Sequence, residues 1–320
     1  MAKNDIQTLT FNYNRSHSTM AEAQFLSPQQ IDRLPSSPAD RRIHYGREPF
    51  QFGDLRLPPT PGSHPVAVVI HGGCWKYRHG DLTADLQNTA ALASALTHHG
   101  IATWNIEYRQ IDIPGGGWTG TFEDVANAID YLRVLAKPYA LDLNRVVIVG
   151  HSAGGHLGTW AAARHRLPQQ SYFLFGEPLH VVGVVNLAGV VDLEAFLQMQ
   201  NQSCGEPVIT RLIGGSPTEV PDRYRLASPS HLLPLGVKQV LVYGAQDKIV
   251  PSWLGQQYAE AARKTGDDVT FASVENTSHF ELIAPGSEAG DRVENAVLSM
   301  LKLKNKDSEK IDPDVGNLWQ

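Results

Sequence analysis

The 320-residue sequence contains only two cysteines, Cys74 and Cys204, which are too few for a disulfide framework. It has no apolar run near the roughly 18 residues that a membrane-spanning helix needs. Its first residues lack the apolar core of a secretory signal. The 27 basic and 33 acidic residues give a net charge of −6, which offers no whole-chain support for binding a polyanion. We therefore expect a cytoplasmic globular protein that binds neither nucleic acid nor membrane.

Motifs for metal and nucleotide binding are also missing. The sequence has no H-E-x-x-H pair, no clustered Cys and His at ligand spacing and no Walker-type phosphate loop. The composition is otherwise that of a globular protein, with 42% hydrophobic and 19% charged residues. We expect neither a metal nor an organic cofactor.

Short apolar runs of Val, Ile and Leu alternate with longer helical stretches from about Arg41 onward. Several runs contain no polar alternation, which favours strands buried on both faces of a parallel sheet. The alternation predicts an α/β fold with a doubly wound, mostly parallel sheet and helices on both faces, whose ligands bind at the carboxyl ends of the strands. The expected strands are 50–57, 66–70, 102–106, 146–149, 181–187, 240–243 and 269–274, and the expected helices are 82–98, 121–135, 153–164, 254–264 and 292–303.

The chain divides into an N-terminal arm at 1–40, a single domain at 41–302 and a charged tail at 303–320. Within the domain, residues 192–234 interrupt the alternation with prolines and a Gly-Gly pair. Such a stretch predicts short helices and loops. We expect it to form a small helical cap over the ends of the strands.

The motif G-x-S-x-G occurs once, at Gly150-His151-Ser152-Ala153-Gly154, directly after an expected strand and directly before an expected helix. This setting is the one a nucleophile elbow requires, because a sharp turn lifts the serine hydroxyl clear of the sheet. A glycine-rich turn with an incidental serine is the alternative. The context favours Ser152 as a catalytic nucleophile.

A serine nucleophile needs a base and an orienting acid, in the chain order serine, acid, histidine for this fold. Asp247 follows the strand at 240–243 and His279 follows the strand at 269–274, so both lie at the functional edge of the sheet. Asp192 is the alternative acid. His156 is expected to be a packed helix residue, and His151 lies too close to Ser152 along the backbone to act as its base.

Upstream, the strand at 66–70 leads into His71-Gly72-Gly73-Cys74-Trp75. An H-G-G-type loop supplies backbone N–H donors to the oxyanion of a tetrahedral intermediate, together with the amide that follows the nucleophile. We expect the amides of Gly73, Cys74 and Ala153 to form this oxyanion hole. Because Cys74 is expected to contribute only its backbone, Cys74→Ser should be mild.

These motifs resemble the α/β-hydrolase superfamily, in the esterase- and lipase-like group that includes the kynurenine formamidases. The formamidases often carry an aromatic residue where this chain has Cys74. The resemblance covers about residues 41–301 and implies a serine hydrolase with no metal and no organic cofactor. It rests on H-G-G-x-W at 71–75, G-H-S-A-G-G-H-L at 150–157, W-N-I-E-Y-R at 104–109 and G-G-G-W at 115–118.

The leading interpretation is a carboxylesterase that acts on small-molecule, short-chain acyl esters through an acyl-enzyme intermediate. Two alternatives remain: an arylformamidase that cleaves N-formyl amides, with Arg211, Arg223 or Arg225 as a clamp for a charged substrate, and a hydrolase-fold binding protein without catalysis. The sequence does not indicate the oligomeric state. Candidate pocket residues are Trp75, Trp118, Phe196 and Phe280.

Overall fold

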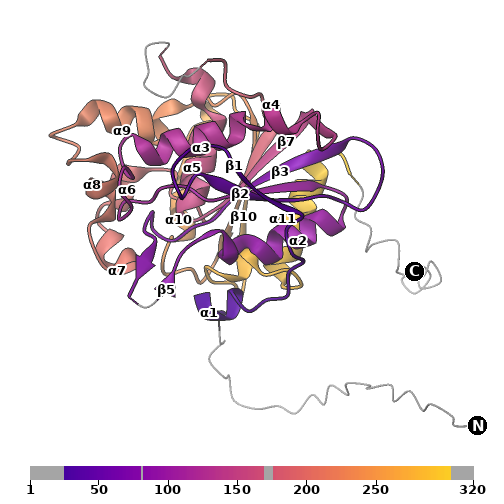
Figure 1. Ribbon diagram of the computed structural model, residues 1–320. Helices are drawn as coiled ribbons and strands as arrows, with labels where there is room; N and C mark the ends of the chain where they lie inside the picture. Colours follow the sequence, from indigo (N-terminus) through magenta and orange to yellow (C-terminus); the bar gives the residue numbers. More distant parts are fainter. Residues whose placement is uncertain (1–24, 81, 169–175, 304–320) are drawn as a thin grey trace, which may run out of the picture.

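The computed structural model describes residues 25–80, 82–168 and 176–303. Most of the predicted N-terminal arm and nearly all of the charged tail therefore lie outside the described residues. Eight strands form one sheet in the order β1-β2-β6-β3-β7-β8-β9-β10 (Figure 1). Their bounds are β1 Arg41–His44, β2 Phe52–Arg56, β3 His64–Ile70, β6 Ala102–Ile106, β7 Leu141–His151, β8 Gly183–Leu187, β9 Lys238–Gly244 and β10 Val269–Val274.

The sheet is parallel from β6 to β10, whereas β1 and β2 add two antiparallel pairings at one edge. This confirms the predicted doubly wound, mostly parallel sheet. The strand β1 was not predicted, because its sequence Arg-Arg-Ile-His has no apolar run. In β3, by contrast, all seven residues are buried. Helices cover both faces there, which is why the strand is apolar after its first residue, His64.

Helices α2 and α11 lie together on one side of the sheet, and α3 and α5 lie on the other (Figure 1). Helix α10 packs against β9 and β10. The predicted helix at 82–98 begins later than expected, because 82–83 pair as a strand and a single 3-10 turn precedes α2. The bounds are α2 Ala90–His98, α3 Gly120–Asp130, α4 Leu132–Leu135, α5 Ala153–Ala162, α10 Ser252–Lys264 and α11 Glu288–Met300, with the two-stranded sheet β4 Arg78–His79 and β5 Leu82–Thr83 and the 3-10 turns η1 Leu86–Thr89, η2 Arg164–Arg166 and η4 Glu281–Ile283.

Short helices fill the segment between β8 and β9 and lie together at the left of Figure 1. These are α6 Leu193–Phe196, α7 Gln200–Cys204, α8 Val208–Ile213, α9 Pro221–Ala227 and the 3-10 turn η3 Pro229–Leu232. We call them the cap. A further four-residue helix, α1 Pro28–Ile31, lies at the bottom of the same view, where Ser27 caps it and Pro28 starts it.

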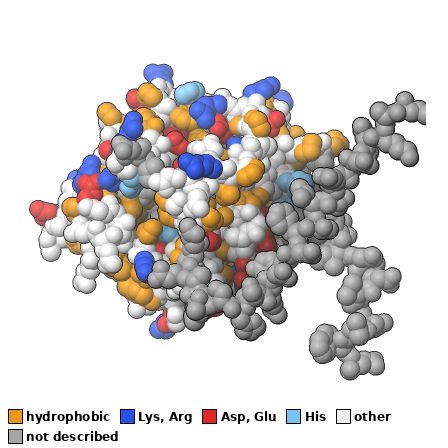
Figure 2. Space-filling view, turned by 90° about the horizontal axis from the view of Figure 1, so that it is seen from below, with side chains coloured by type: hydrophobic (Ala, Val, Ile, Leu, Met, Phe, Trp, Pro, Cys, Tyr) orange, Lys and Arg blue, Asp and Glu red, His pale blue; other side chains and the backbone are white. Residues whose placement is uncertain are grey.

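The surface seen from below mixes hydrophobic side chains with acidic and basic ones (Figure 2). Among the described residues, no helix is long and apolar enough to cross a membrane.

Candidate active site

The predicted nucleophile lies at the junction of β7 and α5. Ser152 has φ 54° and ψ −119°, in the positive-φ region that non-glycine residues seldom adopt. A Cβ on Gly154 would lie 2.2 Å from the carbonyl oxygen of Ile70, and one on Gly150 would lie 2.2 Å from that of Gly154. The two glycines are therefore required by close backbone approach, as a nucleophile elbow needs.

The predicted acid and base are hydrogen-bonded to each other. The Nδ1–H of His279 donates to Asp247 Oδ2 at 2.6 Å, and both side chains are buried. The other carboxylate oxygen of Asp247 accepts the backbone N–H groups of Ile249 and Val250 at 2.7 and 2.9 Å. Because the carboxylate can only accept, it fixes the tautomer of His279 that leaves Nε2 as a base. The alternative acid, Asp192, instead caps α6 by accepting the N–H of Ala195.

Ser152 and His279 line the same cavity. Within the described residues, the hydroxyl of Ser152 makes no hydrogen bond. Such contacts are often long in a free enzyme and close only when substrate binds. The structure thus brings the three predicted residues to one edge of the sheet and connects two of them directly.

The loop after β3 passes beside the nucleophile. A Cβ on Gly72 would lie 2.9 Å from that of Ser152, so only glycine allows this approach. Gly73 and Cys74 both have positive φ, at 105° and 49°. Within the described residues, neither of their amides has an acceptor, and Ala153 begins α5, where the N–H has no partner within the helix. Free amides at these three positions are what an oxyanion hole requires.

His71 is fully buried and supports this loop. Its Nδ1 and Nε2 face the carbonyl of Gly72 and the carboxylate of Glu107, each at 2.9 Å, and Tyr108 stacks on its ring. Burial of the imidazole opposes its charged form, but the carboxylate of Glu107 and the carbonyl of Gly72 together outweigh burial and raise the pKa of His71. Two acceptors facing two ring nitrogens agree with a charged imidazolium.

The two histidines near the elbow are neutral packing residues. Burial lowers the pKa of His151 well below its usual value, with the neighbouring His279 adding to the effect. Its Nε2–H donates to the carbonyl of His279 at 3.1 Å. Burial also lowers the pKa of His156 to about 4. His156 accepts the indole N–H of Trp75 at 3.1 Å and donates to the carbonyl of Ala227 at 3.0 Å, so it connects α5 to the end of α9 in the cap.

The cavity has a volume of about 350 Å³. Phe280 lines it, but three other predicted pocket residues do not. Trp75 is 1% exposed and packs on His156 beneath the loop. Phe196 is buried in the core, and Trp118 lines a separate hollow beside Arg223. The lining residues are Pro28, Ile31, Gly72, Gly73, Cys74, His79, Thr83, Ala84, Asn88, His151, Ser152, Ser203, Ile249, His279, Phe280 and Ile283.

Two walls of this cavity were missed by sequence reasoning. Pro28 and Ile31 come from α1, more than a hundred residues before the nucleophile, and no motif marks them. Ser203 comes from α7 in the cap. Since each is an ordinary residue of a short helix, only the folded chain brings them to Ser152.

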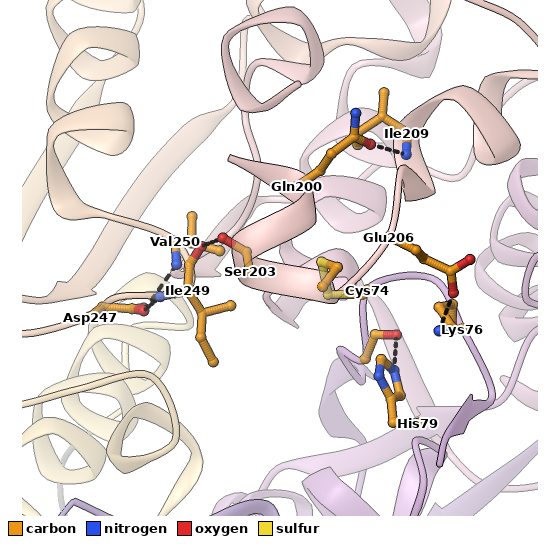
Figure 3. Close-up of a disulfide and its surroundings, with 12 residues drawn as sticks. Cys74, Lys76, His79, Gln200, Ser203, Glu206, Ile209, Asp247, Ile249 and Val250 are labelled. Carbon is orange, nitrogen blue, oxygen red and sulfur yellow. Dashed lines mark hydrogen bonds and ion pairs between the residues drawn. A yellow bond between two sulfur atoms is a disulfide. The ribbon is translucent and has the colours of Figure 1, made fainter. Parts of the chain in front are cut away.

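The two cysteines form a disulfide, contrary to the expectation from their small number. Cys74 and Cys204 are 130 positions apart in sequence and 5.9 Å apart between Cα atoms. The bond connects the loop after β3 to the last residue of α7 (Figure 3). The expectation that Cys74 contributes only its backbone is therefore wrong, because its sulfur holds the loop to the cap.

The site and sheet define a protein with the α/β-hydrolase fold. Similar folds occur in a truncated carbohydrate esterase from gut microbiota, with a TM-score of 0.69, 21% identity and coverage of 83% of this chain and 97% of that one. A propionate-bound esterase, Est2 of Thermogutta terrifontis, has a TM-score of 0.67, 18% identity and coverage of 84% and 95%. The chain belongs to the BD-FAE family, whose model matches residues 54–261.

Curated relatives include esterase LipC of Mycobacterium tuberculosis, 26% identical over 78% of this chain. A probable isoprenylcysteine alpha-carbonyl methylesterase, ICMEL2 of Arabidopsis thaliana, is 22% identical over 87% of this chain. The chain spans 62% of the length of the first and 66% of the second.

Proposed function

We propose that this protein is a serine carboxylesterase that acts on small, short-chain acyl esters. The proposal rests on the residues that surround one cavity. Ser152 lines this cavity from a turn with a strained backbone. The same cavity is bordered by His279, already paired with Asp247, and by the loop with unpartnered amides. The relatives and structural neighbours named esterases add support.

In the proposed mechanism, the Oγ of Ser152 attacks the ester carbonyl while Nε2 of His279 takes its proton. The amides of Gly73, Cys74 and Ala153 stabilise the resulting oxyanion. His279 then gives the proton to the departing alcohol, which leaves an acyl group on Ser152. A water activated by His279 releases the acid, and Asp247 keeps the imidazole oriented through both steps.

The lining of the cavity favours a neutral ester over the formamidase alternative. Among the described lining residues there is no Asp, Glu, Lys or Arg to bind a charged amino-acid group. The three arginines considered as clamps have other partners. Arg211 pairs with Glu206, Arg223 donates to the carbonyl of Ile213, and Arg225 pairs with Asp222.

A direct test compares nitrophenyl esters from acetate to octanoate with N-formylkynurenine on one enzyme preparation. We expect acetate to butyrate to give a kcat/KM at least about tenfold higher than the formamide, a difference of ~1.4 kcal/mol. Ser152→Ala should lower kcat by roughly 10³-fold or more and should abolish labelling by an organophosphate. A formamide value equal to the best ester would favour the formamidase, and labelling of another residue would overturn the scheme.

The cytoplasmic location stays a prediction. Disulfides persist mainly in oxidising compartments, so the Cys74–Cys204 bond weighs against it. Thiol labelling of the protein as it is found in its native cells, before and after reduction, would test this. Labelling before reduction indicates a reducing compartment, and labelling only after reduction indicates an oxidising one.

A further inference from the structure

The disulfide joins the cap to the part of the site where charge would develop during catalysis. Cys74 lies in the loop after β3, and its amide is one of the proposed oxyanion donors. Its sulfur is bonded to Cys204, the last residue of α7 (Figure 3). Both cysteines are only 8% exposed. Cys74 therefore lines the cavity while its buried side chain is bonded to the cap.

Cys74 also has a backbone conformation that needs support. Its φ of 49° lies in the left-handed region, which is unfavourable for a residue with a side chain, and conformations of this kind persist only where the surroundings hold them. The preceding residue is held through its carbonyl, because Gly73 O accepts from Lys76 N and from Nε2 of His79, each at 2.8 Å. The disulfide is the covalent part of this support.

Helix α7 also reaches the acid of the proposed triad. Ser203, next to Cys204, lines the cavity and donates its hydroxyl to the carbonyl of Ile249 at 2.7 Å. The N–H of Ile249 in turn donates to Asp247 Oδ1 at 2.7 Å (Figure 3). Two neighbouring residues of one short helix thus contact the oxyanion loop on one side and the acid loop on the other.

A second link between the same segments is ionic. Lys76 pairs with Glu206, two residues beyond each cysteine (Figure 3). Both side chains are partly exposed, at 16% and 31%. Exposed ion pairs contribute little and are weakened by salt, so this pair cannot replace a covalent bond.

We propose that Cys204 is a positioning residue for catalysis. Through the disulfide it sets the amide of Cys74 toward the oxyanion, and through α7 it keeps Ser203 against the acid loop. This inference rests on the proposed function for the role of the amide. It makes the catalytic rate depend on the oxidation state of the two cysteines.

The chemistry of the switch is ordinary thiol–disulfide exchange. One thiolate of a dithiol reductant attacks a sulfur of the Cys74–Cys204 bond and forms a mixed disulfide. Its second thiolate then releases the protein thiol. Two protein thiols form, and the reductant leaves as a cyclic disulfide that carries the two electrons lost from its own thiols.

The experiment measures ester hydrolysis by the full chain before reduction, after reduction with a dithiol and after reoxidation. Mass spectrometry follows the disulfide itself. We expect reduction to lower kcat about tenfold or more with KM changed less than about threefold, because a displaced oxyanion donor acts on the transition state. Affinity for a trifluoromethyl ketone, which forms a tetrahedral adduct, should fall by the same factor.

Two variants separate positioning from general stability. Cys204→Ser should resemble the reduced wild type and should no longer respond to reductant. Lys76→Ala, which removes only the ionic link, should keep the wild-type response. Reduction of the folded wild type serves the same purpose if Cys204→Ser folds poorly.

Amide hydrogen exchange over Gly72 to Lys76 gives a readout that does not depend on activity, and it should increase on reduction. Unchanged kcat and unchanged exchange in fully reduced protein would overturn the proposal. So would a lower melting temperature with normal kcat at 25 °C, since that marks a merely structural bond. If oxidised protein hydrolyses no ester but exchange still rises on reduction, the proposed function fails while the positioning of the loop stands.

Discussion

Two walls of the cavity are attached to the α/β core by different kinds of interaction. The α7 wall, Ser203 with its neighbour Cys204, is held covalently to the oxyanion loop. The α1 wall, Pro28 and Ile31, is held by apolar burial and by hydrogen bonds. Leu26 N donates to Glu281, and Asn88 donates to Asp32. A reductant should therefore act on the first wall and leave the second in place.

The two walls also end on different parts of the site. The α7 wall leads to the proposed oxyanion amide and, through Ile249, to the acid. The α1 wall leads to Glu281, whose second oxygen accepts the N–H of Ser278, beside the proposed base His279. We expect changes in the α7 wall to alter kcat, and changes in the α1 wall to alter which substrates fit.

The largest effect on kcat is expected from replacing Asp247, the proposed acid that the α7 wall contacts through Ile249. Asp247→Asn can still accept from Ile249, but its amide favours the wrong tautomer of His279. We expect kcat to fall on the order of 10⁴-fold with the fold retained, which sets an upper limit for any effect that α7 transmits through Asp247. Steady-state kinetics beside circular dichroism measures it, and Asp192→Asn is the matched control. Near-normal turnover in Asp247→Asn with a loss in Asp192→Asn would move the acid.

Low pH should lower the free energy of unfolding by protonating His156, which connects α5 to the cap. The folded pKa of His156 is about 4 and its ordinary value is 6.5, so the folded state resists protonation. Stability is then fully present above pH 6.5 and is lost as the pH falls toward 4, by up to ~3 kcal/mol for this residue. Protonation would place an N–H against that of Trp75. His151, also lowered, should act in the same direction.

Urea unfolding at pH 7, 5.5 and 4.5 measures this loss. His156→Gln cannot titrate, and although it lowers stability at pH 7, it should lose less than the wild type between pH 7 and 4.5. An equal loss in both proteins would show that other groups carry the acid sensitivity.

A smaller side chain at Ile31 tests whether the α1 wall limits the length of the substrate. This side chain is 2% exposed and lines the cavity, so Ile31→Ala should open space for a longer ester. We expect the kcat/KM ratio of hexanoate to acetate to rise about tenfold, within the range that a few methylenes in a pocket supply. Leu34→Ala, in the same segment but away from the cavity, is the control. The assignment of this wall would be wrong if both variants gave the same ratio.

The smallest effect expected is that of the ionic link beside the disulfide. Lys76→Ala removes a partly exposed pair with Glu206 and should lower the free energy of unfolding by less than about 1 kcal/mol. Thermal unfolding at low and high salt measures it. A loss as large as that caused by reduction would mean that the ionic link, and not the covalent one, holds the α7 wall.

The sequence was sufficient for the parts of the molecule that repeat a strong physical pattern. Strands such as β3 are buried on both faces, and their buried runs are mostly apolar. The elbow at Ser152 requires glycines because of close backbone contacts, within the turn for Gly150 and with the end of β3 for Gly154. Asp247 and His279 follow strand ends, and parallel strands place such loops at one edge.

The missed features depend on contacts between distant segments. Strand β1 is charged and exposed at the edge of the sheet, so no hydrophobic period marks it. Trp75 was a candidate pocket residue, but its positive φ and its hydrogen bond to His156 place it beneath the loop. The pairing of Cys74 with Cys204 joins segments far apart in sequence, and two cysteines in a chain presumed reduced gave no sign of it.

The position of α1 has a consequence for the order in which the protein is made. Residues 28 and 31 leave the ribosome well before Glu281, whose carboxylate receives Leu26 N and which is synthesised about 250 residues later. At 5–20 residues per second, about 12 to 50 seconds separate them. During that interval the wall has its partner Asn88 but lacks its contact with Glu281, so the substrate cavity is completed only after nearly the entire domain has been translated.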